Sequence, residues 1–163
     1  MASRGSVIPF FISIANENGT LPITDNRMTR FMISLEEGVE LVWHAFDDMQ
    51  GGEIYVKKIP SMKVLDIAHV VAPKVKHKII GIRPGEKLHE ALCIKDEAHL
   101  TIEFKDHYVV EPTTWDFSDK IITYYKNNLG EKGKKVHKNF EYNSFINKDI
   151  LDIKSIKTLL KKY

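Results

Sequence analysis

The first 92 residues alternate between helical and extended hydrophobic patterns, and this order limits the fold more than any other feature of the chain. Turn residues separate the two kinds of pattern. In chain order the patterns predict a helix over 6–18, an extended piece over 21–24, a strand over 29–33, a helix from 35, a strand over 53–59, a helix from 61, a strand over 76–82 and a helix from about 85. Such alternation is typical of an α/β fold, and 163 residues can enclose a hydrophobic core.

Two serines mark expected helix starts. Ser34 is followed three residues later by Glu37, which is the spacing of a capping box, so a helix should begin at Leu35. Ser61 is expected to cap the next helix. Apolar side chains fall on one face of the helix that begins at Leu35: Val39, Val42, Phe46 and Met49. The strand "KHKIIGI" has a nearly continuous apolar end, which is typical of buried parallel strands.

The pattern changes after Cys93: the segment "DHYVVEP" is expected to be extended, and beyond Trp115 the chain is polar and rich in lysine. We expect two parts, 1–115 and 116–163, the second being a basic tail that ends in an amphipathic helix over 149–163. From Lys120 onward there are 11 Lys and 4 acidic residues, a net charge of +7. Such a tail suits either a polyanionic partner or an ordinary solvated surface.

Composition excludes several classes of function. The net charge of +2 is too small to predict nucleic-acid binding, and no apolar run is long enough to predict a membrane span, so a cytoplasmic location is expected. With one cysteine the chain can form no internal disulfide, and no metal site is predicted. Cys93 is expected to be a buried residue in a helical stretch. His89 and His99 are expected on helix surfaces.

Arg83 is the first candidate ligand-binding residue. It follows an apolar strand, at the position where open α/β sheets bind ligands, and a helix N-terminus two or three residues later would favour an anion. A permanently charged guanidinium suits a diphosphate, and Glu86 suits the hydroxyls of a ribose. The alternative is a simple Pro-Gly turn in which Glu86 offsets the helix dipole.

Arg30 and the residues before the first helix raise the same question. Arg30 lies among apolar residues before a capped helix, so it could bind phosphate, or it could face solvent or pair with an acidic residue such as Asp25. Ser3, Arg4, Gly5 and Ser6 form a small basic entry to a helix, which could hold phosphate or sugar hydroxyls or be an ordinary N-cap. The chain contains no G-x-G-x-x-G, no P-loop and no Tyr-x-x-x-Lys, so no catalytic constellation can be assembled.

Several segments together resemble a known family. "SRGSVIPFF", "LPITDNRMTRFMISLEEGV", "GGEIYVKKIPSMKVLDIA" and "KIIGIRPGEKLHEAL" are similar to the carboxyl-terminal half of the inverting UDP-N-acetylglucosamine 4,6-dehydratases, which belong to the extended short-chain dehydrogenase/reductase superfamily. "KDEAHLTIEF", "HYVVEP", "EKGKKV" and "FEYNS" resemble the tail of that family. The resemblance covers nearly the whole chain and implies the carboxyl-terminal part of a Rossmann-like fold.

The resemblance also implies a substrate and a set of contacts. It implies UDP-N-acetylglucosamine as the substrate, converted to a 4-keto-6-deoxy sugar with inversion at C5, for bacterial surface polysaccharide or pseudaminic acid. In such enzymes the position of Arg83 contacts the diphosphate, that of Glu86 the ribose and that of Arg30 the phosphates. The segment from Ser3 to Ile8, which includes Val7, and the "LPIT" strand with Thr24 would line the uridine and sugar side. Residues 1–115 would then be the nucleotide-sugar-binding part.

The family uses NADP and a Tyr-x-x-x-Lys pair, and both would lie upstream of "SRGSV". We therefore expect a catalytically incomplete chain that carries the UDP-sugar half, needs a missing N-terminal half and has no metal. The resemblance implies a homo-oligomer for the full-length family. One alternative is a non-catalytic nucleotide-sugar or partner-binding module, and a second is a polyanion-binding protein that uses the basic tail.

Overall fold

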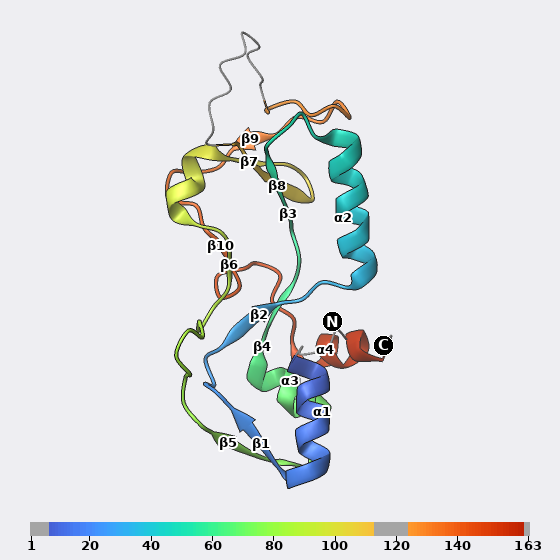
Figure 1. Cartoon of the computed structure of the whole chain (residues 1–163), viewed down its shortest axis with the longest axis vertical. Helices are drawn as coiled ribbons and strands as arrows, with labels where there is room; N and C mark the ends of the chain where they lie inside the picture. Colours follow the sequence, from blue (N-terminus) through green and yellow to red (C-terminus); the bar gives the residue numbers. More distant parts are fainter. Residues whose placement is uncertain (1–6, 113–123, 162–163) are drawn as a thin grey trace. The chain divides into compact units, whose positions relative to one another are not determined.

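The computed structural model describes residues 7–112 and 124–161, and these form two compact units, each built from separate stretches of chain (Figure 1). Unit 1 comprises Met1–Ile33, Ile59–Glu90 and Ser144–Tyr163, and unit 2 comprises Ser34–Lys58 and Ala91–Asn143. Parallel and antiparallel pairs of strands occur together with helices, which confirms the α/β class. The functional division into 1–115 and 116–163 stays a prediction.

Unit 1 holds three helices and two small sheets. Its elements are α1 (Val7–Asn18), β1 (Thr20–Ile23), β2 (Thr29–Phe31), β4 (Ser61–Lys63), α3 (Val64–Val71), β5 (Lys76–Ile79) and α4 (Ile153–Leu160). Strands β1 and β5 are parallel, and β2 and β4 are antiparallel. The core lies among the helices and β1, where Leu21, Ile23, Ile67 and Ile156 are fully buried. The predicted amphipathic helix at the end of the chain therefore docks into this unit through Ile156.

Unit 2 holds one long helix and an antiparallel sheet. Its elements are α2 (Leu35–Asp48), β3 (Ile54–Lys57), β6 (Ala91–Cys93), a 3-10 helix η1 (Lys95–Leu100), β7 (Thr101–Glu103), β8 (His107–Val110), β9 (Lys134–Lys135) and β10 (Tyr142–Asn143). The four-stranded sheet has the order β3-β8-β7-β9, and β10 pairs with β6. Ile102, Phe104, Val109 and Tyr124 form a core in this unit. No helix within the described ranges is long and apolar enough to cross a membrane.

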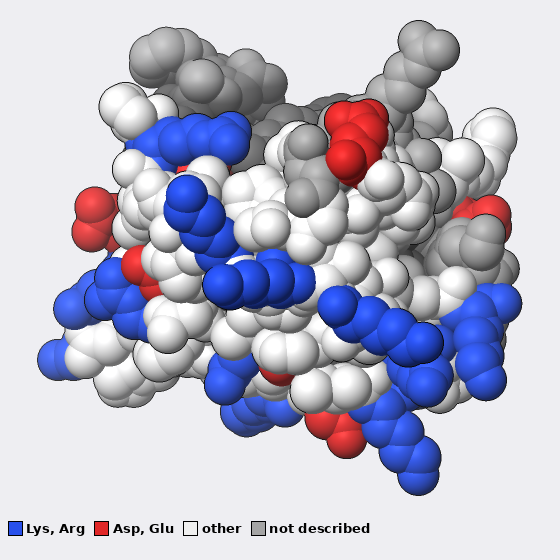
Figure 2. Space-filling model, turned by 90° about the horizontal axis from the view of Figure 1, so that it is seen from below, with Lys and Arg blue, Asp and Glu red and all other residues white. Residues whose placement is uncertain are grey.

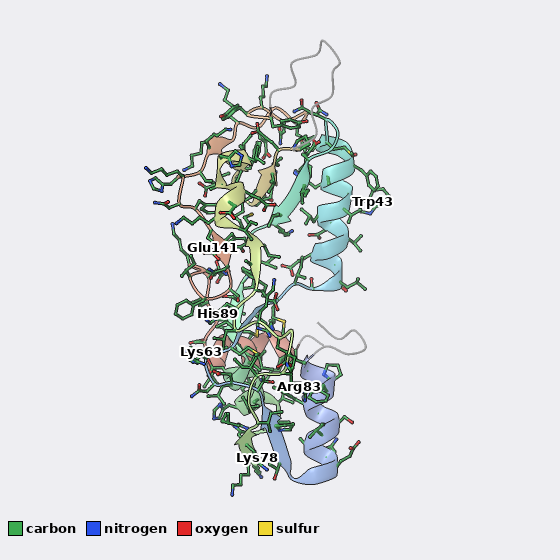
Figure 3. All side chains as sticks on the ribbon, turned by 60° about the vertical axis from the view of Figure 1, so that its left-hand side comes forward. Trp43, Lys63, Lys78, Arg83, His89 and Glu141 are labelled. Carbon is green, nitrogen blue, oxygen red and sulfur yellow. The ribbon has the colours of Figure 1, made fainter. Side chains whose placement is uncertain are left out.

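The start of α2 is as predicted, but its apolar face is not covered by described residues. Ser34 caps the helix with a complete capping box, in which its hydroxyl accepts from the Glu37 N–H and its own N–H donates to Glu37. Several apolar side chains of the helix are nevertheless exposed, and Trp43 projects away from it (Figure 3). They are Leu35, Val39, Val42, Trp43 and Phe46.

The predicted cap at Ser61 is wrong, because Ser61 belongs to a strand. It is fully buried in β4, opposite Phe31 of β2, and its backbone also bonds to Asp149 and Leu151. Helix α3 begins three residues later, and its N-cap Lys63 makes no side-chain cap. A serine before an apolar run therefore predicts a helix cap even where its backbone groups are used in strand pairing.

The helix predicted from about Gly85 is also wrong. Residues 84–90 form turns and bends, and β6 follows. Gly85 has φ +85°, a left-handed conformation that interrupts a helix and favours glycine. Cys93 lies in β6 and not in a helix, although it is fully buried as expected, and burial raises the pKa of its thiol to about 12.

Strand β5 is parallel as predicted but is not buried. Ile79, Ile80 and Ile82 are each more than 40% exposed, and β1 is the partner with which β5 pairs. A continuous apolar run predicts a strand whose two faces are both covered by other parts of the protein. The described residues leave the apolar side chains at the end of β5 exposed.

Candidate functional site

The carboxyl ends of β1 and β5 open onto a pocket of about 560 Å³ within unit 1. Most of its lining is apolar, and four polar or charged side chains converge on it. The polar group is Thr24, Arg30, Arg83 and Glu86, and the apolar group is Val7, Phe10, Phe11, Pro22, Met28, Phe31, Met32, Ile33 and Val64. An apolar cavity with a few convergent polar groups is the usual form of a small-molecule site.

Strand pairing places these polar residues at one edge. Ile23 of β1 pairs with Ile79 of β5, and the Ile80 N–H donates to the Ile23 carbonyl at 2.9 Å. Thr24 and the segment 81–86 therefore leave the sheet at the same end. The predicted position of Arg83 beyond the carboxyl end of a parallel strand is thus confirmed, and this is where open α/β sheets bind ligands.

A tight turn presents Arg83 and Glu86 to the pocket. The Glu86 N–H donates to the Arg83 carbonyl at 3.1 Å, and the Arg83 N–H donates to Glu86 Oε2 at 3.0 Å. No helix follows the turn, so no helix dipole adds to the charge of Arg83. The Arg83 side chain lies near α1 and makes no hydrogen bond or ion pair with the described residues (Figure 3). Its charge is free to meet an anionic group.

Arg30 lines the same pocket, but its guanidinium is already bonded. Its N–H groups point to the carbonyl oxygens of Thr29, Leu88 and Lys87 at 2.7, 3.1 and 2.9 Å, and to the Met28 sulfur at 3.1 Å. Its Nε lies 3.3 Å from a carboxylate oxygen of Glu90. Arg30 thus holds the 87–90 segment against β2.

The alternative for Arg30, pairing with an acidic residue, is confirmed in kind, but the partner is Glu90 and not the suggested Asp25. Asp25 is bonded to Arg27 through two side-chain hydrogen bonds of 3.0 and 2.8 Å and one to the Arg27 backbone N–H. The Arg27 guanidinium and N–H lower the pKa of Asp25 to about 2. Asp25 is therefore occupied with its own turn.

Sequence reasoning missed a polar cluster that supports the pocket. The Thr29 hydroxyl lies 2.8 Å from His89 Nδ1 and 2.7 Å from the Ser144 hydroxyl, which also accepts from the Glu90 N–H. His89 stacks on Phe145 with ring centroids 4.6 Å apart, so it does not lie on a helix surface as predicted. The hydrogen bonds of the cluster join residues 54 to 115 positions apart, so no local spacing could have revealed it.

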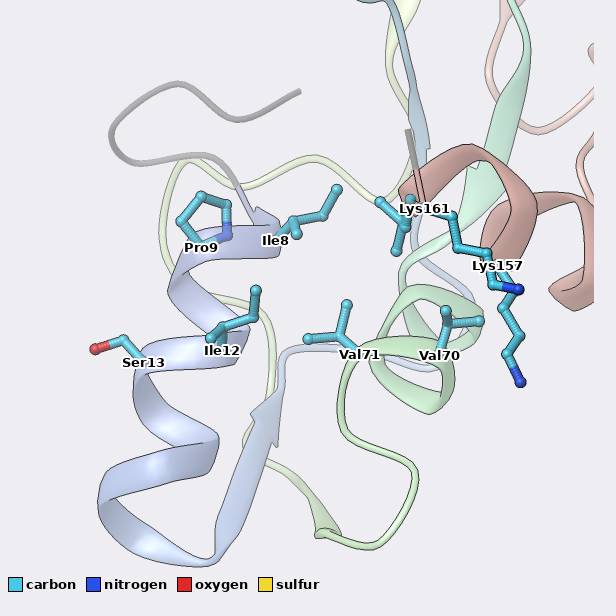
Figure 4. Close-up of a pocket in the computed structure, with 9 residues that line it drawn as sticks. Ile8, Pro9, Ile12, Ser13, Val70, Val71, Lys157 and Lys161 are labelled. Carbon is cyan, nitrogen blue, oxygen red and sulfur yellow. The ribbon is translucent and has the colours of Figure 1, made fainter. Parts of the chain in front are cut away.

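The remaining predicted site residues separate into two groups. Val7 lines the pocket, whereas Ile8 is buried in the core and faces a second pocket of about 600 Å³ between α1, α3 and α4 (Figure 4). Ser3, Arg4, Gly5 and Ser6 lie outside the described residues. The second pocket is apolar, with Lys157 and Lys161 among its lining residues, so it has few groups to orient a polar ligand.

The parallel strand pair in the described part of the chain lacks the strand-to-helix connection that binds a dinucleotide pyrophosphate. Neither parallel strand is followed by a helix, since β1 leads through a turn to β2, and β5 leads through the 83–86 turn to β6. A dinucleotide pyrophosphate needs a glycine-rich turn that opens a helix directly after a strand. We therefore assign no cofactor contact to the described residues.

A model of the polysaccharide biosynthesis protein family matches residues 1–112. The chain belongs to this family. Two bacterial proteins are similar to most of the chain. The chain is 54% identical over 145 residues to the UDP-N-acetylglucosamine 4,6-dehydratase (inverting) of Campylobacter jejuni subsp. jejuni serotype O:2. The aligned region covers 88% of this chain and 43% of that protein. The chain is 51% identical over 160 residues to the protein of the same name from serotype O:23/36, with coverage of 94% and 48%.

A solved structure supports the fold of this polysaccharide biosynthesis protein. The X-ray structure of Pen from Bacillus thuringiensis matches with a TM-score of 0.78 and 28% identity, covering 99% of this chain and 46% of that one. The fold is thus that of part of a short-chain dehydrogenase/reductase protein, as the sequence predicted. The chain spans under half the length of the proteins that it matches.

The described structure gives little support to the polyanion-binding alternative. On the face drawn in Figure 2, Lys and Arg side chains are interspersed with uncharged and acidic ones. Two lysines of the basic tail also have acidic partners, since Lys134 pairs with Glu103 and Lys135 with Glu111. A polyanion site needs an uninterrupted basic surface.

Proposed function

We propose that the pocket at the carboxyl ends of β1 and β5 binds the UDP part of a UDP-sugar, and that the chain is the substrate-binding portion of an inverting UDP-N-acetylglucosamine 4,6-dehydratase. The observation that carries the proposal is the convergence of Thr24, Arg30, Arg83 and Glu86 on one apolar pocket. The identity of 51–54% to proteins of that name supports the choice of substrate. The location proposed for the protein is the cytoplasm, as expected from the sequence.

Each polar residue has a separate part in this proposal. Arg83, whose guanidinium has no partner among the described residues, binds the diphosphate. Glu86 uses one carboxylate oxygen to hold the turn and keeps the other for the ribose hydroxyls. Arg30 adds positive charge at the pocket wall while it holds the 87–90 segment in place. Thr24 and Val7 lie toward the uridine and sugar.

Aromatic side chains supply the apolar surface for the uracil ring or the sugar. Phe10, Phe11 and Phe31 all line the pocket, and Phe10 is 41% exposed. Aromatic faces stack on bases and on the apolar faces of sugars, and such contacts tolerate small changes of orientation. The charged residues would then fix the register of the nucleotide.

The dehydratase reaction itself belongs to a protein that also supplies NADP and a proton-transfer pair. The described residues would bind and orient the UDP-sugar, and NADP would supply the hydride chemistry. The alternative of a non-catalytic nucleotide-sugar module uses the same pocket and the same residues. The two differ in one observation, because a chain that belongs to a dehydratase carries the glycine-rich motif and Tyr-x-x-x-Lys in frame before "SRGSV".

Isothermal titration of the chain with UDP-N-acetylglucosamine, UDP and UMP tests the binding proposal. We expect UDP and the UDP-sugar to bind, UMP to bind more weakly, and Arg83→Ala to weaken UDP binding at least tenfold. Loss of a charge-assisted hydrogen bond to phosphate costs roughly 1.5–3 kcal/mol, which corresponds to such a change.

Lys74→Ala is the matched control, because Lys74 is an exposed cation of unit 1 outside the pocket. It should bind UDP as the wild type does. Equal affinity of Arg83→Ala and wild type for UDP would refute the diphosphate assignment. Equal affinity for UDP and UMP would refute a role for the second phosphate.

A further inference from the structure

A cluster of three potential metal ligands lies in unit 2, apart from the nucleotide pocket of unit 1. His44 of α2, His107 of β8 and Glu131 of the loop before β9 each offer one ligand atom, and these atoms lie within 4.8 Å of one another. The cluster joins residues up to 87 positions apart, so its spacing in the sequence matches no metal-binding motif.

The His107 ring is buried and packed between two aromatic rings, and its Nε2 has no hydrogen-bond partner among the described residues. It is 1% exposed, and its ring is stacked between Phe104 at 4.8 Å and Tyr55 at 5.5 Å. Its Nδ1 lies 2.8 Å from a carboxylate oxygen of Asp106, while its Nε2 is buried and has no hydrogen-bond partner among the described residues. When Nδ1 donates its proton to Asp106, a neutral ring presents the Nε2 lone pair toward the cluster.

His44 has the same unsatisfied atom. Its Nε2 is buried without a hydrogen bond to any described residue, and its ring centroid is 4.9 Å from that of His107. Two buried ring nitrogens that make no hydrogen bond are costly, because each has lost its hydrogen bonds to water.

Carboxylates surround the two rings. Asp48 is fully buried, lies 3.9 Å from His44 Nε2 and accepts hydrogen bonds from the Tyr55 hydroxyl and the Leu129 N–H. Glu131 is oriented by Asn127, whose Nδ2 donates to Oε2 at 3.0 Å. Among the described residues no Lys or Arg pairs with Asp48, Asp106 or Glu131, so the cluster has an excess of negative charge.

We propose that His44 Nε2, His107 Nε2 and a Glu131 carboxylate oxygen bind a divalent transition metal of the zinc class, with a fourth position for water. Zinc prefers two or three imidazole nitrogens with a carboxylate, in tetrahedral geometry with bonds of about 2.0–2.2 Å. Such ligands are about 3.4 Å apart, so small side-chain movements within the observed 4.8 Å suffice. Magnesium and calcium prefer oxygen ligands and fit this set poorly.

The surrounding groups match what such a site requires outside its ligands. Asp106 accepts from His107 Nδ1 and Asn127 donates to Glu131, which fixes both ligands in orientation. His44 is 28% exposed as a side chain, which leaves a route for the ion. The metal would tie α2 to β8 and to the loop before β9 within unit 2.

Zinc titration of the whole 163-residue chain tests the proposal. After treatment with a chelator, zinc is added in competition with a chromophoric indicator, and the melting temperature is measured in parallel. We expect one zinc per chain and a melting temperature that rises with zinc. Cobalt, used as a probe, should give the visible spectrum of a tetrahedral nitrogen and oxygen site.

Three variants assign the ligands. His44→Ala and Glu131→Gln should each weaken zinc binding at least tenfold and abolish the rise of the melting temperature with zinc, each measured relative to the metal-free form of the same variant. His69→Ala is the matched control, since His69 and His77 form a second imidazole pair in unit 1 with centroids 4.7 Å apart. It should bind zinc as the wild type does.

Two results would overturn the proposal. The first is a wild-type chain that binds no zinc at micromolar concentration while its circular dichroism shows a folded protein. The second is loss of binding in His69→Ala with binding retained in His44→Ala, which would assign the metal to the other pair. A cobalt spectrum that does not change in Glu131→Gln would remove the carboxylate from the set.

Discussion

Arg30 and Arg83 line the same pocket, but their guanidinium groups are in different chemical situations. The Arg30 guanidinium makes four hydrogen bonds and an ion pair with protein groups. The Arg83 guanidinium makes no hydrogen bond or ion pair with the described residues. Substitution of Arg30 would therefore disturb the 87–90 segment as well as any ligand, and only Arg83 reports on the ligand cleanly. Sequence patterns treat the two arginines alike, because the partners of Arg30 are up to 60 residues away.

His77 provides a residue-scale prediction about pH. Burial, together with the positive field of His69, lowers its pKa below the ordinary value of 6.5. The unfolded chain therefore binds a proton at His77 more readily than the folded chain does. Its contribution to stability is complete above about pH 6.5 and is lost as the pH falls below that value toward the lowered pKa.

We expect His77→Gln to reduce the loss of stability between pH 7 and pH 5. Urea denaturation at each pH measures the free energy of unfolding, and the slope for the variant should be smaller than that for the wild type. His137→Gln is the control, because His137 is exposed, and it should keep the wild-type slope. A His77→Gln slope equal to that of the wild type would show that His77 is not responsible.

At the scale of the elements, the contribution of the Ser34 cap to the stability of α2 can be measured. Ser34→Ala removes the hydroxyl that accepts the Glu37 N–H at 3.1 Å, and such caps contribute about 1 kcal/mol. We therefore expect Ser34→Ala to lower the free energy of unfolding of the chain by about that amount, measured by urea denaturation. Ser155→Ala, at an exposed position of α4, should change it by less than about 0.5 kcal/mol. Equal effects of the two substitutions would mean that the capping box does not stabilise α2.

Elements were predictable where the signal is local. The helices at 7–18 and 35–48, the strand β1 and the turn at Asp25 follow from spacing, caps and turn residues. The predicted helix near Gly85 failed because apolar residues at helical spacing followed a turn in which Gly85 is left-handed and Glu86 bonds back to Arg83. The predicted helix cap at Ser61 was wrong for a related reason, because the backbone of Ser61 pairs with Asp149 and Leu151, which are almost 90 residues away.

At the scale of the whole molecule, the two units are built from interleaved segments. Residues 144–163 belong to the same compact unit as residues 1–33, and 91–143 belong with 34–58. Composition suggests a boundary where the charge changes, but compactness depends on pairings such as Ser61 with Leu151 that no charge pattern contains. The candidate metal cluster was missed for the same reason, because its three ligands come from three distant parts of unit 2.

The two proposed ligands should act on different units, and hydrogen exchange can separate them. A ligand that binds the folded state slows opening of the unit that holds its contacts. UDP should therefore increase protection of amides in β1, β5 and the 83–86 turn of unit 1, and zinc should protect α2, β8 and the loop around Glu131 in unit 2. Arg83→Ala should lose the first effect and keep the second, and His44→Ala should do the reverse. Protection by zinc around His69 and His77 in place of unit 2 would contradict the metal assignment while leaving the nucleotide assignment intact, whereas protection by UDP confined to unit 2 would contradict the nucleotide pocket alone.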